Sequence, residues 1–143
     1  MGGKVLLKRS SQLIELSYVS KASRQMNLID LVHLFDVSYK WNLDHEITGV
    51  LFYENGMFSQ ILEGSEDDVM EVWSKIRQDN RHQVLRQLNY SPYHQRRYPN
   101  WALRFYQGDL IAKYIPQIGK VLDGLPSHDH ELLEIMRSVE ELA

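Results

Sequence analysis

Three hydrogen-bonding side chains occupy positions where the hydrophobic pattern of the chain predicts core residues. Tyr18 continues the apolar face of segment 13–19, Asn42 ends the apolar stripe of a helix, and Gln60 lies within the apolar segment 57–63. A buried amide without a partner costs about 1–3 kcal/mol, so each side chain needs one. The two amides could match a planar heterocycle whose edge alternates carbonyls and ring nitrogens, and a tyrosine near Gln60 could donate an electron and a proton. The alternative is that all three are satisfied core residues.

The first two predicted elements position Tyr18 and Asn42. Residues 13–19 alternate between apolar and polar side chains, which is typical of a strand. Asn27 is the predicted N-cap of a helix with Asp30 in its first turn. The predicted apolar stripe of this helix, which extends toward Ser38 and Asn42, consists of Leu28, Leu31, Val32 and Phe35.

A hairpin positions Gln60. Its predicted strands run from Ile47 to Tyr53 and from Met57 to Glu63, on either side of an Asn55-Gly56 turn. Both faces of the second strand carry apolar residues, which predicts a central strand covered on both sides.

The remaining elements complete the predicted fold. Ser65 is the predicted N-cap of a second helix, whose stripe is Val69, Val72, Trp73 and Ile76. Strands are predicted over residues 84–90 and 101–106, and two helices within residues 108–143. The order is βαββαββ, so we expect an α+β, ferredoxin-like sandwich with both helices on one sheet face and a C-terminal helical extension.

Five segments of the chain carry a family resemblance. Residues 15–20 (ELSYVS) resemble the first strand of BLUF domains, which are blue-light sensors. Asn42 followed by residues 47–49 (ITG) resembles the helix end and second strand of that family. Residues 58–64 (FSQILEG), 79–82 (DNRH) and 96–101 (RRYPNW) are similar to the family's FxQxLEG, DPRH and RRFPDW segments. All five occur in order at family-like spacing between about residues 13 and 107, which makes the match specific.

The resemblance implies a non-covalently bound flavin, FAD in most members, with FMN or riboflavin as alternatives. It implies that Asn42 holds the flavin edge and that Gln60 bridges Tyr18 and the ring. Ser38 is expected to line the same pocket, with Arg81 and His82 near the ribityl or phosphate side. Arg81 and His82 could instead belong to a solvated turn.

The resemblance also implies a photochemical mechanism. Light drives electron and proton transfer from Tyr18, and Gln60 emerges rearranged. The signal is expected to leave through strand five, with Trp101 and Leu103 as relay residues, and to pass through the C-terminal helices to a partner. Two residues depart from the family pattern: Leu103 stands where many members have methionine, and Trp41 replaces a small or polar residue. The Trp41 side chain could face solvent or stack on the flavin.

Composition limits the other classes of function. The 143 residues include no cysteine and carry a net charge of -3, which excludes disulfides and argues against nucleic-acid binding. No segment is long and apolar enough for a membrane span or signal peptide, and a cytoplasmic protein without a bound metal is expected.

We expect three regions: an N-terminal segment (1–11), a flavin-binding domain (12–107) and a helical extension (108–143). The extension, about 36 residues, is too short for a catalytic domain, so the chain is expected to be a non-enzymatic photoreceptor. Its expected partners are a downstream signalling protein and further copies of itself. The alternative is a ferredoxin-like, flavin-dependent redox enzyme acting in the dark, and a third candidate is an interaction domain without flavin.

Overall fold

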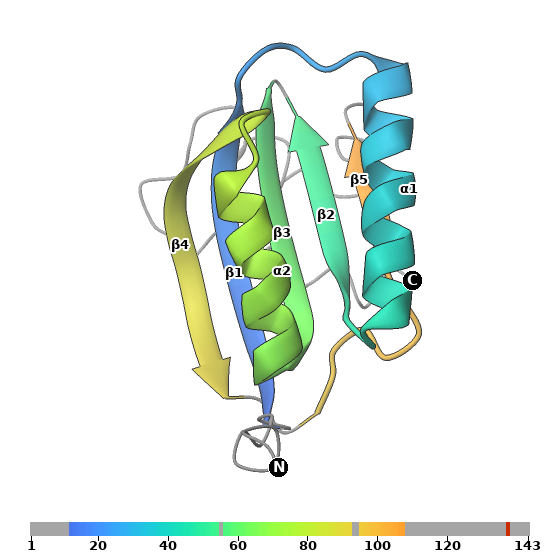
Figure 1. Cartoon of the computed structure of the whole chain (residues 1–143), viewed down its shortest axis with the longest axis vertical. Coiled ribbons are helices and arrows are strands. Elements are labelled where there is room, and N and C mark those ends of the chain that lie inside the picture. Colours follow the sequence, from blue (N-terminus) through green and yellow to red (C-terminus); the bar gives the residue numbers. More distant parts are fainter. Residues whose placement is uncertain (1–11, 55, 93–94, 108–136, 138–143) are drawn as a thin grey trace, which may run out of the picture.

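A computed structural model describes residues 12–54, 56–92, 95–107 and Arg137. Seven elements follow one another in the predicted order βαββαββ (Figure 1). They are β1 (Leu13–Ala22), α1 (Leu28–Asp44), β2 (Thr48–Glu54), β3 (Met57–Ser65), α2 (Glu66–Gln78), β4 (His82–Pro92) and β5 (Arg104–Gln107). The ferredoxin-like α+β class is therefore confirmed. Segment 1–11 and the predicted C-terminal helices lie outside the described residues, apart from Arg137.

The five strands form one sheet in the order β4-β1-β3-β2-β5. Neighbouring strands are antiparallel, except that β5 runs parallel to β2. Both helices lie on the same face of this sheet (Figure 1). The prediction of a covered central strand is correct, because β3 lies in the middle and is buried from Met57 to Gly64.

Strand β1 is also buried on both faces, from Ile14 to Ser20. Its pairing with β3 runs in regular register from Leu13 opposite Ser65 to Lys21 opposite Met57. Its pairing with β4 is interrupted by two register shifts, one on each side of the dipeptide Tyr18–Val19. The ladder that holds Tyr18 is therefore continuous toward β3 and irregular toward β4.

Helix α1 begins as predicted but packs through a different face. The side chain of Asn27 accepts a hydrogen bond from the backbone N–H of Asp30, and the Asp30 carboxylate accepts one from the backbone N–H of Asn27, which completes a capping box. The predicted apolar stripe is wrong at Leu28 and Val32, which are 67% and 59% exposed. The helix is rotated so that Leu31 and Asn42 face the sheet, and this turns Leu28 and Val32 toward solvent.

Helix α2 follows Ser65, the predicted N-cap position, but the Ser65 hydroxyl does not cap a backbone N–H. It donates instead to the Asp68 carboxylate, at 2.8 Å. The predicted core-facing stripe is confirmed, because Val69 and Trp73 are buried and Val72 and Ile76 pack against the same cluster. Acidic residues occupy the first turn and basic residues the last, which complements the helix dipole.

The last two strands differ from the predicted ranges. Strand β4 is longer, and β5 begins at Arg104 rather than at Trp101. The Trp101 backbone N–H donates to the Tyr98 carbonyl in a turn, and its own carbonyl accepts from the Gly49 backbone N–H at 3.0 Å. Trp101 is therefore attached to β2 by a loop contact before the β2–β5 ladder starts.

Candidate functional site

Tyr18 and Gln60 meet directly across the β1–β3 ladder. They are register partners, and their side chains are 3% and 5% exposed. The phenol of Tyr18 donates a hydrogen bond to Gln60 Oε1. This orientation leaves the NH2 group of Gln60 to donate elsewhere, so the amide is held with its two chemically different ends facing different neighbours.

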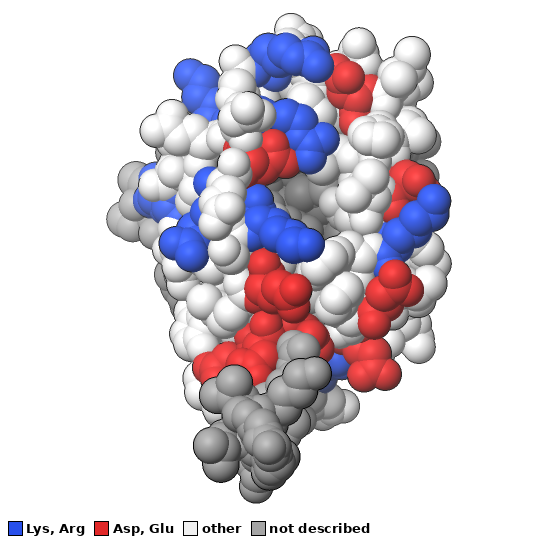
Figure 2. All heavy atoms as spheres, viewed as in Figure 1, with Lys and Arg blue, Asp and Glu red and all other residues white. Residues whose placement is uncertain are grey.

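A cavity of about 240 Å³ opens beside this pair, bounded by both helices and the sheet. Its lining includes all six residues predicted to bind the cofactor: Tyr18, Ser38, Asn42, Gln60, Arg81 and His82. Apolar side chains complete the walls: Met26, Leu34, Val37, Leu51, Phe58, Val72 and Ile76. Figure 2 shows a hollow between the two helices on this face of the molecule. A few polar groups on an apolar wall are typical of a small-molecule site.

Asn42 connects the cavity to the segment before β5. It is 1% exposed, and its amide NH2 donates to the carbonyl of Ala102 at 2.8 Å. The buried position predicted for Asn42 is therefore correct. One of its amide donors serves the protein itself, next to Leu103.

The surroundings of Tyr18 keep its phenol protonated. Burial raises the pKa of Tyr18 well above its ordinary value, and the negative charge of Asp79 raises it further. The ring packs against buried Trp73 on α2, with 4.9 Å between ring centroids. Tyr18 is therefore a buried phenol packed against an aromatic ring, and its raised pKa favours the protonated form.

Arg81 and His82 are both engaged with protein groups. The guanidinium of Arg81 forms hydrogen bonds of 2.9 and 3.0 Å with the two carboxylate oxygens of Asp79. This pairing lowers the pKa of Asp79 below its ordinary value. His82 Nδ1 lies 2.7 Å from the Ser20 hydroxyl, and Nε2 lies 2.6 Å from the carbonyl oxygen of Ile76. His82 thereby fastens the end of α2 to β1.

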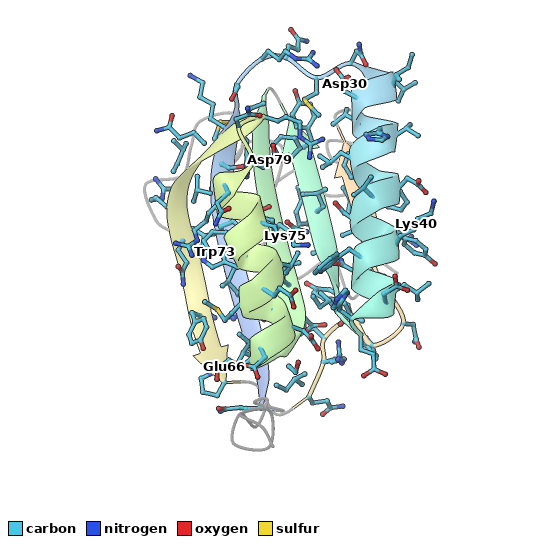
Figure 3. The ribbon with its side chains drawn as sticks, viewed as in Figure 1. Asp30, Lys40, Glu66, Trp73, Lys75 and Asp79 are labelled. Carbon is cyan, nitrogen blue, oxygen red and sulfur yellow. The ribbon has the colours of Figure 1, made fainter. Side chains whose placement is uncertain are left out.

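Two further charged residues line the cavity and were not among the predicted cofactor contacts: Lys75 and Asp79. Figure 3 shows Lys75 extending from α2 toward α1, and Asp79 at the C-terminal end of α2. Lys75 Nζ lies 3.5 Å from the centre of the Trp41 ring, and Trp41 stacks on His45 at 3.9 Å. The helical spacing of Lys75 and Asp79 from the core-facing Val72 and Ile76 is a sequence signal that could have placed them at the rim.

The predicted relay residues lie apart from the cavity. Leu103 is 6% exposed and packs in a core cluster with Leu31, Leu51 and Phe58. Trp101 stacks on Tyr98 with 5.3 Å between ring centroids. Neither side chain lines the cavity beside Tyr18 and Gln60, so any link to that pair passes through intervening residues such as Asn42.

The fold and the cavity define a small α+β domain with a pocket that is lined by apolar side chains, a phenol and two amides. The family model described as "BLUF: Sensors of blue-light using FAD" matches residues 13–104. The chain belongs to the BLUF family of flavin-binding blue-light sensors.

Known proteins with similar sequence or structure carry the same domain. Photoactivated adenylate cyclase subunit beta of Euglena longa is 34% identical over 116 residues, which cover 80% of this chain and 14% of that protein. The chain thus spans about a seventh of the length of such curated relatives. The dark-state structure of BlrB, a BLUF protein, has a TM-score of 0.82 and 26% identity, covering 93% of this chain and 98% of BlrB.

A bacterial light-regulated adenylyl cyclase has a TM-score of 0.69 and 33% identity, covering 85% of this chain and 36% of the cyclase. The similarity to these proteins lies in the sensory domain, and the cyclases are longer chains in which this domain is a part. Neither of the two described helices of this chain is long and apolar enough to span a membrane.

Proposed function

We propose that this chain is a photoreceptor that binds FAD in the cavity between α1 and α2 and signals through a light-driven rearrangement of Gln60. The contact between the Tyr18 phenol and Gln60 Oε1 beside that cavity carries the proposal. Family membership supports the flavin. The choice of FAD over FMN or riboflavin follows the family description.

The residues around the cavity fit a flavin. Its volume of about 240 Å³ is below that of most drug-sized sites, so it suits one planar ring system better than a whole dinucleotide. The walls are apolar, while Asn42 and Gln60 supply the amides that a ring edge of carbonyls and nitrogens requires. Lys75 brings positive charge to the rim, where the ribityl and phosphate groups would lie, whereas the charge of Arg81 is paired with that of Asp79.

A flavin held by these residues would supply absorption of blue light and a one-electron acceptor. Tyr18 is the proposed donor, because its ring lines the cavity and its phenol is hydrogen-bonded to Gln60, whereas the Trp41 indole, which also lines the cavity, has no such bond to a described residue. The Tyr18 phenol carries its proton at neutral pH, and burial, which raises its pKa, favours that form further. That proton has a direct path along the hydrogen bond to Gln60 Oε1. When the electron returns, Gln60 gives one proton back to the Tyr18 oxygen, so the tyrosine is restored and the amide is again neutral.

Gln60 retains a change in hydrogen bonding after the electron has returned, because its amide can adopt two arrangements. In the described arrangement, Oε1 accepts from Tyr18, which leaves the NH2 group able to donate to another neighbour. Once the amide has rearranged, by tautomerisation, rotation or both, its donor and acceptor are offered to different neighbours. The two states satisfy different neighbours, which allows a change at one side chain to shift a packing equilibrium.

The signal then passes to a downstream protein. Relatives in which a similar domain is part of a light-regulated cyclase support an effector that responds to this domain. We assign sensing rather than catalysis to residues 12–107. We propose that a downstream effector protein receives the signal either through contact with the remainder of this chain or through a partner protein.

The test is the absorption spectrum of the purified protein with FAD, recorded before and after blue light. We expect a reversible red shift of an oxidised flavin. Gln60→Leu should retain flavin and lose the shift. The matched control is Gln87→Leu, because Gln87 is the β4 register partner of Tyr18 and its side chain is exposed.

Three results would contradict the proposal. A protein that cannot take up flavin is one, and a shift that persists in Gln60→Leu is another. Turnover of a reduced nicotinamide in the dark, with no light-induced shift, would favour a redox enzyme instead.

A further inference from the structure

Two glutamates are buried on the sheet face that points away from the helices. Glu15 on β1 and Glu63 on β3 are register partners, and both are 0% exposed. They lie three residues from Tyr18 and Gln60 on the same two strands, and odd spacing on a strand places them on the opposite face. Like charges directly opposite one another repel, so this pair requires compensating partners.

Glu63 holds the segment that leads to β5. Its Oε1 accepts from the Thr48 hydroxyl and the Tyr98 backbone N–H, both at 2.9 Å. Its Oε2 accepts from the Arg97 backbone N–H at 2.7 Å. One carboxylate therefore fixes residues 97–98 against β2 and β3.

Glu15 reaches three other parts of the chain. It accepts from the Asn89 amide on β4 at 3.1 Å and from Arg97 Nε at 3.1 Å. Its third partner is the guanidinium of Arg137, which lies 122 positions away in the sequence. The side chain of Glu15 is fully buried, while those of Arg97 and Arg137 are 27% and 24% exposed.

We propose that the Glu15–Arg137 ion pair is the contact through which the state of the Tyr18–Gln60 pair reaches residues 108–143. This inference rests on the proposed photoreceptor function and adds a route that does not use strand five. The two register pairs share one ladder, so a shift of β3 against β1 at Gln60 also changes the separation of Glu63 and Glu15.

The electrostatics explain why such a shift matters at Arg137. Arg137 offsets part of the repulsion between the Glu15 and Glu63 carboxylates. The energy with which Arg137 binds Glu15 therefore depends on the distance between these two carboxylates. Because Glu15 is excluded from water, the attraction and the repulsion are both weakly screened. A small displacement in the ladder therefore changes the affinity of residue 137 for the sheet.

The test uses hydrogen exchange of peptides covering residues 108–143 in the full-length, flavin-loaded protein, in the dark and under blue light. Glu15→Gln and Arg137→Gln should each keep the flavin red shift. Both should accelerate exchange of these peptides in the dark by about tenfold, because they remove a buried charge-assisted hydrogen bond. Both should also abolish the difference between dark and light.

The control is Arg24→Gln, because Arg24 is an exposed arginine whose ion pair with Asp30 lies outside this network. It should leave exchange unchanged. If Glu15→Gln does not fold, Arg137→Gln decides the question alone, because its side chain lies at the edge of the network.

Unchanged exchange in a folded Arg137→Gln protein would overturn the inference. A light response of residues 108–143 that is lost in Leu103→Ala but kept in Arg137→Gln would also overturn it, in favour of strand five. A parent protein without a red shift would refute the proposed function, and the dark comparison would then still decide whether Arg137 docks on Glu15.

Discussion

Replacement of Tyr18 by phenylalanine removes a single oxygen atom from the cavity wall. The ring can keep its packing against Trp73, 4.9 Å away, but Gln60 Oε1 loses its donor. A buried acceptor left without a donor costs about 1–3 kcal/mol, and we expect the free energy of unfolding of the flavin-free protein to fall by that amount. Urea denaturation followed by tryptophan fluorescence measures it.

The same variant should bind flavin and lose the light-induced red shift. Flavin binding persists because Ser38 and Asn42 are untouched, while the electron and proton donor is gone. Absorption spectra in the dark and under blue light measure both properties on one sample.

Tyr53→Phe is the matched control. Tyr53 is also a buried tyrosine, 6% exposed, and its hydroxyl accepts from the Met26 backbone N–H at 3.2 Å. The free energy of unfolding of Tyr53→Phe should fall by a similar amount, about 1–3 kcal/mol. The red shift should be retained, because Tyr53 is not among the cavity-lining residues. A red shift that survives in Tyr18→Phe, or that disappears in both variants, would refute the assignment of Tyr18 as the donor.

Three further variants test other parts of the site. Trp41→Phe should change the yield of the red-shifted form under fixed illumination, because the indole lines the cavity beneath Lys75, and an unchanged yield would limit Trp41 to packing. Gly49→Ala should lower the free energy of unfolding by about 3 kcal/mol, because a Cβ would lie 2.0 Å from the Ile61 carbonyl oxygen, and urea denaturation measures this loss. Burial raises the pKa of Glu63, so the folded protein holds this proton more tightly than the unfolded chain does. Stability should decrease as pH rises from the ordinary carboxyl range through that raised pKa, and urea midpoints should show a shallower decrease in Glu63→Gln.

Local patterns were enough to predict the parts of the fold that depend on nearby residues. The capping box at Asn27 and the apolar β3 strand are determined within a few positions of the sequence, and both are confirmed. Tyr18 and Gln60 could be identified because each interrupts an apolar face, and a polar side chain in such a place requires a partner.

The rotation of α1 and the start of β5 could not be predicted in this way. Leu28 and Val32 are as apolar as Leu31, and only the packing of the helix on the sheet decides which of them is buried. Trp101 suits a strand by residue type, but its carbonyl accepts from Gly49 in a loop, so the strand starts later.

The network around Glu15 was also beyond local prediction. A glutamate that alternates with apolar residues on a strand is typical of a solvent-facing position. Glu15 is buried because Arg97 and Arg137 cover it from 82 and 122 positions away.

The interrupted ladder between β1 and β4 has a practical consequence for engineering. The β1–β3 ladder runs without a break, so inserting one residue into either strand would turn Tyr18 or Gln60 toward the wrong face. Strand β4 lies at the edge of the sheet and already accommodates two register shifts against β1. A labelling peptide or fusion joint is therefore best tolerated at the C-terminal end of β4, near Pro92. A further register shift between β4 and β1 at that point would leave the pairing of Tyr18 with Gln60 intact.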